Sequence, residues 1–354
     1  MNKIINLLKE KKSIPLDQFI NIALYDKKFG YYMKNNPIGE KGDFITSPLI
    51  SNLFGEMIAV WCVAFWEHMG KPRKILLVEL GPGDGSLCKD LLNTFKQFKN
   101  FYNSLEINLL EISDKLKIIQ KTKFNNKKVK WIKNIREINY GPVIFLANEF
   151  FDALPIKQIY KKEKFFFEKY VTLSSNKKKL KFLHKKANNN LIKSIRKLNL
   201  VSTGNTIEYP IEALKFIKSI AKKINKFNGG LLTFDYGYTT KKNKNTLQSV
   251  KKHKYIDVFF KPGRSDITSL INFKLFHKML SKNNLDVKKI TMQSEFLKKI
   301  GILERAHILS KKMTFKAKAN MFYRLKRLID PKEMGDLFKV IFSQKKGSNF
   351  SLGF

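Results

Sequence analysis

Cysteine and histidine are scarce in this chain of 354 residues, which has two cysteines and five histidines. Cys62 and Cys88 lie far apart, and neither belongs to a CxxC pair or has a histidine at metal-ligand spacing. These absences exclude a disulfide framework and a cysteine-based metal site. We therefore predict no metal, and we expect both thiols to be reduced packing residues.

Long apolar runs are also missing. No stretch reaches the roughly 18 uninterrupted apolar residues of a membrane span. The opening residues, Met1 to Ile5, lack the apolar block and small-residue cleavage site of a signal peptide. We expect a soluble protein that is not exported, and its 43% hydrophobic content suits a globular chain with a substantial core.

Acidic residues are few, at 29 against 69 lysines and arginines, which gives a formal net charge of +40. Such a charge ordinarily indicates nucleic acid or an anionic surface as a partner. The excess is nearly all lysine, spread along the chain with abundant asparagine and isoleucine, as an AT-biased genome produces at neutral surface positions. We therefore predict no nucleic-acid partner. RNA binding stays an alternative, because Lys177 to Lys179 form a basic run near the aromatic Phe182.

Short apolar runs alternate with helical patterns, which predicts a doubly wound, mainly parallel sheet. The first predicted strand, 75–80, runs straight into glycines. Further strands are expected at 107–111, 129–132, 143–147 and 231–235, with a last strand at 337–342. Helices are expected at 51–68, 86–98 and 271–280, and 292–328 reads as mostly helical.

A glycine-rich turn follows the first strand, in the sequence Glu79-Leu80-Gly81-Pro82-Gly83-Asp84-Gly85-Ser86. Glycines there let the backbone approach a ligand that side chains would block. A dinucleotide fingerprint requires glycine at position 86, and a Walker loop requires Gly-Lys-Ser/Thr, which is absent. The E-x-G-x-G-x-G form suits S-adenosyl-L-methionine, so we predict that Glu79, Gly81, Gly83 and Gly85 bind this cofactor.

An acidic residue closes the second strand. Glu111 lies about 26 residues beyond Gly85 and meets the same need as the ribose-binding acid of a Rossmann fold. We predict that it accepts hydrogen bonds from both ribose hydroxyls. The alternative is an exposed carboxylate at a strand end.

Polar residues gather after the fourth strand, in the run Asn148 to Pro155. Ligands of open α/β sheets bind at the carboxyl ends of the strands, so Asn148, Glu149 and Asp152 should face the transferred methyl. Paired carboxylates suit a cationic acceptor such as arginine, and we predict Glu149 and Asp152 as catalytic residues and Asn148 as a cofactor ligand. The alternative is that Asp152 caps a following helix, and we expect Phe151 to be a core residue.

Two further candidates lie in the polar loop 42–48, which precedes a buried helix and is placed to close over the cofactor. We predict that Asp43 acts on the acceptor and that Thr46 contacts the cofactor. Asp235, at the end of the fifth strand, offers another carboxylate near the same rim. His253 is interpreted as structural.

Blocks of this sequence resemble the MidA-like methyltransferases and occur in that family's order over nearly the whole chain. The matching blocks are 30–32, 42–46 with 54–56, 79–83, 148–155, 235–237, 262–263 with 266–268, and 334–335 with 338–340. Leu49 and Asn272 stand where the family commonly has acidic residues. The resemblance implies a Rossmann-like class I methyltransferase sheet with S-adenosyl-L-methionine as cofactor.

The order of the predicted elements indicates a division of the chain, because the residues between the fourth and fifth strands are too many for one crossover. We predict an N-terminal helical lid segment at 1–70, a cofactor-binding core at 71–156 and 229–354, and an inserted substrate or partner subdomain at 157–228. Alternating residues from 158 to 183 predict antiparallel strands in the insertion, around a turn at 174–176.

Protein arginine methylation is the activity that the resemblance implies, in the mitochondrial family member on a subunit of NADH-quinone oxidoreductase. A protein substrate of that kind is therefore expected, and a homodimer is compatible with the sequence. Because the family-like sequence begins almost at residue 1, we expect a bacterial cytoplasmic protein. The alternatives are methylation of RNA or a small molecule, and a non-catalytic assembly factor that binds a partner through 157–228.

Overall fold

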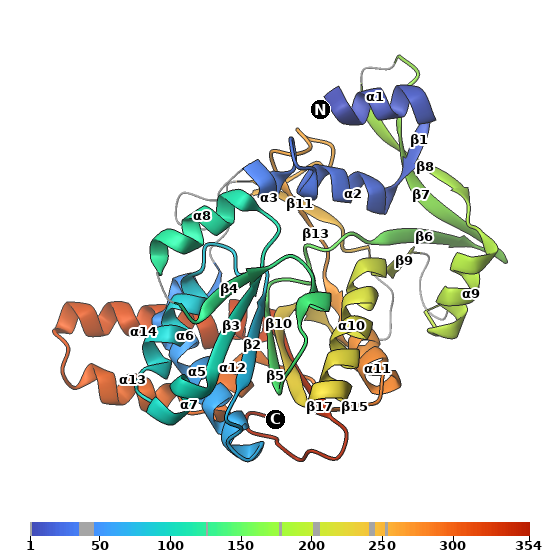
Figure 1. Ribbon diagram of the computed structural model, residues 1–354. Coiled ribbons are helices and arrows are strands. Elements are labelled where there is room, and N and C mark those ends of the chain that lie inside the picture. The colour runs from blue at the N-terminus through green and yellow to red at the C-terminus, as the bar shows by residue number, and fades with distance from the viewer. Residues whose placement is uncertain are drawn as a thin grey trace.

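A nine-stranded sheet with helices on both faces, seven of its strands in one continuous order, forms the centre of the molecule in a computed structural model that describes residues 2–34, 46–124, 127–176, 179–200, 206–240, 245–251 and 254–354 (Figure 1). The strand order is β15 (Leu285–Val287), β17 (Phe338–Lys345), β10 (Gly229–Tyr238), β5 (Val143–Asn148), β2 (Ile75–Leu80), β3 (Leu105–Leu110) and β4 (Val129–Ile132). The strands from β10 to β4 are parallel, whereas β17 runs antiparallel to β10. The predicted α/β fold is therefore confirmed.

Successive residues of each central strand point to opposite faces of the sheet, and both faces are covered by helices. Along β2, Ile75 and Leu77 pack in one core with α5 (Asn52–His68) and α6 (Ser86–Phe95). Leu76 and Val78 pack in the other with α10 (Ile211–Phe227) and α11 (Phe273–Lys282). Strands buried on both faces read as continuous apolar runs, which is why the sequence located them. Both cysteines are buried free thiols in the first of these cores, as expected.

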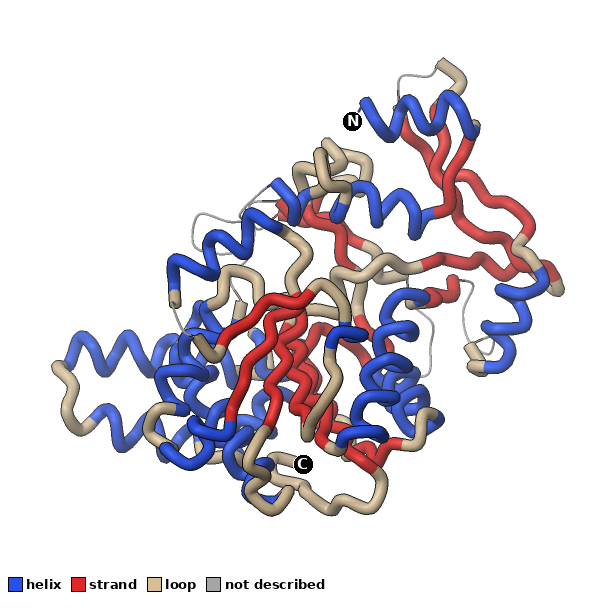
Figure 2. Tube along the Cα trace, viewed as in Figure 1, coloured by secondary structure: helices blue, strands red, loops and turns tan. Residues whose placement is uncertain are grey.

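A second, smaller sheet lies at one end of the molecule (Figure 2). Its strands run in the order β1 (Ser13–Pro15), β7 (Phe165–Leu173), β6 (Lys157–Lys162) and β9 (Thr206–Tyr209), and β8 (Leu180–Lys186) pairs with β7. The predicted turn at 174–176 does join two antiparallel strands, β7 and β8. Lys157 links this sheet to α2 (Leu16–Tyr25), because its Nζ lies 2.9 Å from Asp17 and 2.5 Å from Glu168.

The range predicted for the insertion contains strands of the small sheet and also a helix that packs on the main sheet. Residues 157–228 include β6 to β9 and α9 (Asn189–Lys197), but also α10, which contacts β5 and β10 of the main sheet. The small sheet in turn takes β1 from the N-terminal segment.

The C-terminal part is mostly helical, as predicted, and ends in β17. Its helices are α11, α12 (Gln293–Lys299), α13 (Ile302–Ser310), α14 (Phe315–Ile329) and α15 (Met334–Leu337). The helix predicted from 271 begins at Phe273, because Ile271 and Asn272 first pair with β10 as β14. Asn272 caps α11 by accepting a hydrogen bond from the Leu275 amide at 3.1 Å.

The remaining described elements include a third sheet, in the strand order β12 (Lys254–Ile256), β11 (Gln248–Lys251) and β13 (Asp266–Thr268). The short strand β16 (Thr291–Met292) pairs with β17 of the main sheet, and α1 (Asn2–Lys11) contacts the small sheet. The other elements are α3 (Tyr31–Lys34), α4 (Ser47–Ile50), α7 (Lys99–Ser104), α8 (Asp114–Lys123) and the 3-10 helix η1 (Ile135–Glu137). In the part of the chain that the structure describes, no helix is both long and apolar enough to cross a bilayer.

Candidate active site

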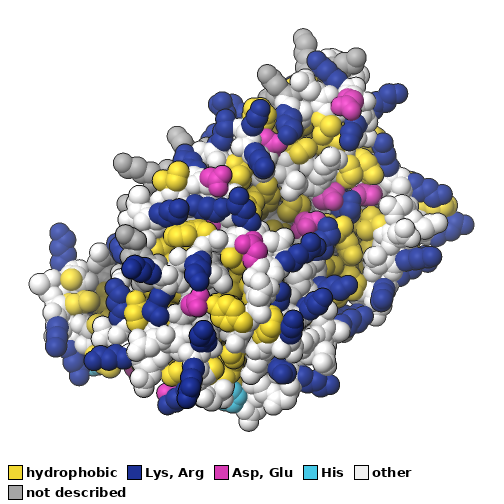
Figure 3. Space-filling model, viewed as in Figure 1, with side chains coloured by type: hydrophobic (Ala, Val, Ile, Leu, Met, Phe, Trp, Pro, Cys, Tyr) yellow, Lys and Arg dark blue, Asp and Glu magenta, His cyan; other side chains and the backbone are white. Residues whose placement is uncertain are grey.

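A cavity of about 740 Å³ opens at the carboxyl ends of the central strands. Its walls include Gly81 after β2, Glu111 after β3 and Glu149 after β5. Elements from outside the main sheet complete it, since Tyr25 of α2 and Asp266 of β13 also line it. Figure 3 shows a hollow with hydrophobic side chains on this face, with acidic side chains gathered beside it. The cavity thus lies where ligands of open α/β sheets bind.

Most of the predicted site residues come together in this cavity. Its lining contains six of them: Thr46, Gly81, Gly83, Glu111, Glu149 and Asp152. Glu79, Gly85 and Asn148 are close in sequence to lining residues but are not themselves in the lining. The predicted catalytic residue Asp43 lies outside the described residues, as does His253.

The turn after β2 has a backbone that favours glycine. Gly81, Gly83 and Gly85 have φ angles of 62°, 56° and 82°. A Cβ on Gly81 would lie 2.8 Å from the Phe150 ring, so a larger residue there would also displace a wall of the cavity. These constraints keep the turn free of side chains beside the cavity.

Glu79 is buried beneath this turn. It is 3% exposed, and its Oε2 atom has no hydrogen-bond partner. Burial, together with the nearby Asp84 and Glu111 carboxylates, raises the pKa of Glu79 to about 8. Glu79 is therefore protonated in the folded protein at neutral pH.

Replacing Glu79 with glutamine is expected to flatten the pH dependence of stability. Unfolded Glu79 titrates near pH 4.3, about its ordinary pKa, whereas the folded protein holds the proton up to about pH 8. Between these values the unfolded state binds fewer protons, so this group lowers the free energy of unfolding by about 1.4 kcal/mol per pH unit as pH rises. Glutamine cannot titrate and removes that slope.

Urea denaturation at pH 5.5 and pH 7.5 measures this effect. The exposed Glu67, paired with Lys71 on the surface, gives a matched control in Glu67→Gln, which should keep the wild-type slope. An unchanged slope in Glu79→Gln would show that the buried carboxyl is not protonated.

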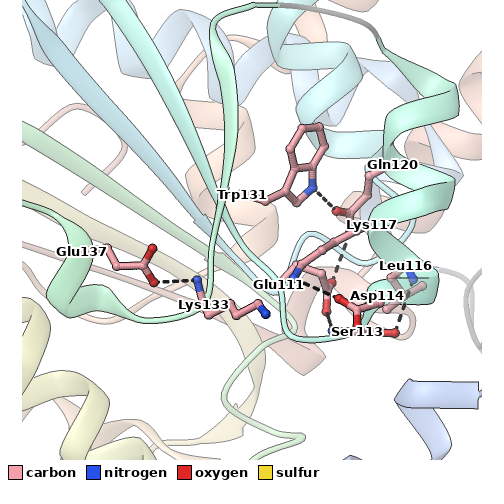
Figure 4. A network of polar contacts seen from close by, with 9 residues as sticks. All are labelled: Glu111, Ser113, Asp114, Leu116, Lys117, Gln120, Trp131, Lys133 and Glu137. Atoms are coloured by element: carbon pink, nitrogen blue, oxygen red, sulfur yellow. Dashed lines mark hydrogen bonds and ion pairs between the residues drawn. The ribbon is translucent and has the colours of Figure 1, made fainter. Parts of the chain in front are cut away.

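A hydrogen-bond network holds Glu111 at the end of β3 (Figure 4). Its Oε1 accepts a bond from the Ser113 amide at 2.8 Å, and its Oε2 accepts one from Gln120 Nε2 at 3.1 Å. The same Nε2 donates to the Gly83 carbonyl at 2.7 Å, and Gln120 Oε1 accepts from the Trp131 indole at 2.7 Å. Gln120 therefore joins the predicted ribose acid to the glycine turn. Burial raises the pKa of Glu111, although it remains in the cavity wall.

Gln120→Leu is expected to destabilise the protein by about 2–4 kcal/mol and to weaken cofactor binding about tenfold. The stability loss follows because the part-buried Trp131 N–H and Gly83 carbonyl lose their partner. The affinity loss follows because the Glu111 carboxylate loses the bond that orients it. Urea denaturation and calorimetric titration with S-adenosyl-homocysteine measure the two effects.

The exposed Gln97 provides the control, since Gln97→Leu should leave both quantities near wild type. If Gln120→Leu loses stability but keeps the wild-type affinity for S-adenosyl-homocysteine, the role of Gln120 is purely structural.

On the opposite side of the cavity, Glu149 has a backbone that is uncommon for its residue type. Its φ is 51°, in the left-handed region, and its amide donates to the Phe234 carbonyl at 2.9 Å. Its Oε1 accepts bonds from the Ser47 amide and from Asn148 Nδ2, both at 3.3 Å. Burial, aided by the Asp152 charge, raises the pKa of Glu149 to about 8. Such strain and such a pKa are concentrated at functional sites.

Asp152 lies near Glu149 in the cavity wall, and its Oδ1 atom is buried without a partner. Burial and the carboxylates of Asp235 and Asp266 raise its pKa well above the ordinary value. The chain continues from it through turns into β6, so no helix follows that Asp152 could cap. Asp235 itself is fully buried and accepts bonds from the amides of Phe151, at 2.9 Å, and Asp152, at 3.4 Å. Asp235 thus shapes the loop and does not line the cavity.

Sequence reasoning gave no role to three residues of this wall. Tyr32 donates a hydrogen bond to Asp266 Oδ1 at 2.9 Å, and Tyr25 stacks on Tyr32 with ring centroids 5.6 Å apart. Tyr25 also donates to the Ala153 carbonyl at 2.9 Å. Tyr32 and Asp266 stand in blocks of the family resemblance, which was an available signal. Nothing in the sequence singled out Tyr25.

Buried acceptors without partners test whether these residues suit a ligand. Asp152 Oδ1 in the cavity wall and Asn148 Oδ1 at the end of β5 have no hydrogen-bond partner among the residues that the structure describes. Leaving such atoms unpaired is costly, so they point to a ligand that donates hydrogen bonds. The amine of S-adenosyl-L-methionine and a guanidinium are donors of this kind.

Comparisons with known proteins agree with this geometry. A sequence model of a family described as "Putative S-adenosyl-L-methionine-dependent methyltransferase" matches residues 57–291. The mitochondrial protein arginine methyltransferase NDUFAF7 of Danio rerio is 33% identical over 92% of this chain and 82% of its own length. The Homo sapiens protein of the same name is 29% identical over 94% of this chain and 80% of its own length.

Solved structures share the fold. A Burkholderia thailandensis protein, crystallised with S-adenosyl-homocysteine, matches 99% of this chain and 93% of its own with a TM-score of 0.84 at 21% identity. The fold of the whole described chain is therefore one that an experimental structure already contains.

Proposed function

Because this chain belongs to the family of S-adenosyl-L-methionine-dependent methyltransferases that this model describes, we propose that it methylates arginine side chains of a protein. The acidic composition of the cavity lining carries the proposal. Its lining has five acidic residues, Glu111, Glu149, Asp152, Glu212 and Asp266, against two basic ones, Lys133 and Arg327. The whole chain has the opposite balance, 29 acidic against 69 basic residues. A cavity of this kind selects a cation from its surroundings.

The cofactor side of the cavity is formed by the glycine turn and Glu111. S-adenosyl-L-methionine supplies a methyl group that its sulfonium makes electrophilic. Glu111, fixed by Ser113 and Gln120, would accept hydrogen bonds from the ribose hydroxyls, while Gly81 and Gly83 allow close approach of the backbone. The name of the relatives, protein arginine methyltransferase, supports the acceptor that we propose.

The acceptor side is formed by Glu149, Asp152 and Asp266. Among the described residues, the two hydrogen bonds that Glu149 accepts both use Oε1, which leaves Oε2 for a guanidinium N–H. Asp152 Oδ1 offers a second acceptor, and Tyr32 orients Asp266 beside them. Two or more carboxylates in fixed positions orient a planar guanidinium and stabilise its charge. The positive charge of a bound guanidinium would favour the ionised form of Glu149. Its Oε2 would then receive the proton that the attacking nitrogen loses as the methyl group leaves the sulfonium and S-adenosyl-homocysteine is released.

A labelling assay tests the proposal. It uses tritiated S-adenosyl-L-methionine as methyl donor and protein extract from cells that lack the gene as methyl acceptor. After incubation with the purified protein, acid hydrolysis should place the label in methylarginine. Label in methyllysine, RNA or a small molecule would overturn the proposal and favour the corresponding alternative. Glu149→Gln protein provides the control for contaminating methyltransferases.

Finer predictions belong to this proposal. A subunit of NADH-quinone oxidoreductase is the first acceptor to test. The homodimer and the bacterial cytoplasmic location stay predictions, and the relatives' printed names place those proteins in mitochondria.

A further inference from the structure

One end of the molecule is formed by a projecting pair of helices, α13 and α14 (Figures 1 and 2). We define the hairpin tip as residues 307–324, which comprise the end of α13, the turn and the first two-thirds of α14. Ile302 and Ala306 at the base of α13 are buried, as are Leu325 and Leu328 of α14. The hairpin is thus anchored in the core at its base, while its tip extends into solvent.

Large apolar side chains are exposed along this tip. Phe315 is 88% exposed, Tyr323 65% and Ile308 58%, and Met313 and Phe322 are more than a third exposed. Phe315 and Phe322 are seven residues apart in α14, so they lie on one face of the helix, and the buried Leu328 lies well round the helix from them. Exposed apolar groups that gather on one face mark an interaction surface.

The same tip is basic. It contains five cations and no acidic residue: Lys311, Lys312, Lys316, Lys318 and Arg324. None of the five takes part in the ion pairs found among the described residues. Their charge is therefore available to a partner.

We propose that the hairpin tip binds the surface of a bilayer that contains anionic lipid. Such surfaces attract lysines and arginines, and their headgroup region accepts the aromatic and aliphatic side chains of a basic amphipathic helix. The projecting, convex shape suits a flat surface. A second copy of the chain is disfavoured, because five cations would face five others. RNA could stack bases on the three exposed rings of the tip but would gain nothing from the exposed Ile308 and Met313, which a bilayer interface accepts, so RNA binding is kept as an outcome of the test.

The hairpin tip and the cavity are connected by a single helix, α14. α14 continues from the tip to Arg327, which lines the cavity. At about 1.5 Å per residue, Arg327 lies about 18 Å along the helix from Phe315. Docking by the tip would therefore hold the cavity close to the bilayer, within reach of acceptor proteins at the membrane surface.

Vesicle flotation tests the proposal on the full-length protein. Vesicles of phosphatidylcholine with about 30 mol% phosphatidylglycerol, which have an anionic surface, are compared with vesicles of phosphatidylcholine alone. We expect flotation only with the anionic vesicles and a marked decrease in high salt. Changing Lys311, Lys312, Lys316 and Lys318 to glutamine should weaken binding about a hundredfold or more, since each lysine near the surface contributes about fivefold. Phe315→Ser with Phe322→Ser should weaken it about tenfold or more.

Matched controls come from β8 and β7 in the small sheet, at the opposite end of the molecule (Figure 1). Changing Lys179, Lys181, Lys185 and Lys186 to glutamine removes the same charge, and Phe165→Ser removes an exposed aromatic. Both control proteins should float like wild type. The proposal is overturned if wild type does not float with anionic vesicles, or if control and tip variants lose binding equally. It is also overturned if Phe315→Ser instead breaks a dimer in sedimentation or abolishes RNA binding without changing flotation.

Discussion

Glu149→Gln is expected to lower kcat/KM for arginine methylation about a thousandfold while leaving affinity for S-adenosyl-homocysteine within about threefold of wild type. The carboxylate is the cavity's candidate both for pairing with the guanidinium and for taking its proton, and glutamine does neither. Leaving a charge in a buried site without its partner costs roughly 4 kcal/mol, which is about a thousandfold. The fold should persist, because glutamine Oε1 can still accept the bonds from Ser47 and Asn148.

Glu163 gives a closely matched control. It also has a left-handed backbone, with φ of 53°, but it is exposed in the turn between β6 and β7. Glu163→Gln should therefore keep full activity. Steady-state kinetics with a methyl acceptor and calorimetry with S-adenosyl-homocysteine separate the two sides of the cavity. Full activity of Glu149→Gln would remove Glu149 from the acceptor site.

Glu111→Gln has the second large expected effect, on the cofactor. Losing the negative charge weakens two charge-assisted hydrogen bonds to the ribose, at a cost of roughly 2 kcal/mol, or about thirtyfold in Kd. Glutamine keeps one acceptor oxygen for the Ser113 amide, but its amide nitrogen cannot accept the bond from Gln120 Nε2, so the substitution also loses one of the two supporting bonds. Calorimetric titration with S-adenosyl-homocysteine measures the loss.

The control lies on the same strand. Glu106 stands in β3, where its carboxylate pairs with Lys130 at 3.0 Å outside the cavity. Glu106→Gln should bind S-adenosyl-homocysteine as wild type does. Equal affinities in the Glu111 and Glu106 variants would argue that the cofactor's sugar lies elsewhere.

The sheet was predictable because its physical requirements are local. β2 and β5 are buried on both faces, so each appears in the sequence as an unbroken apolar run, and glycines mark the end of β2. The small sheet was harder, since β1 reaches it from a distant part of the chain to pair with β7. A strand of three residues is too short to show an alternating pattern, so the sequence does not predict this long-range pairing.

Site residues were predictable where they directly follow a strand. Glu111 and Glu149 follow β3 and β5, and parallel strands bring their carboxyl ends to one edge. Tyr25 and Gln120 were missed because their roles depend on tertiary hydrogen bonds, to the Ala153 carbonyl and to Glu111. Helical spacing alone marks Tyr25 as a residue of an amphipathic helix and says nothing of its hydroxyl.

A crystal structure of the protein soaked with S-adenosyl-homocysteine is the most direct test of the central claim. We predict density for the nucleoside between the turn at Gly81–Gly83 and the end of β3, with both ribose hydroxyls about 2.6–3.2 Å from the Glu111 carboxylate. Density for the nucleoside in another cavity, or a Glu111 carboxylate with no contact to the sugar, would contradict the claim.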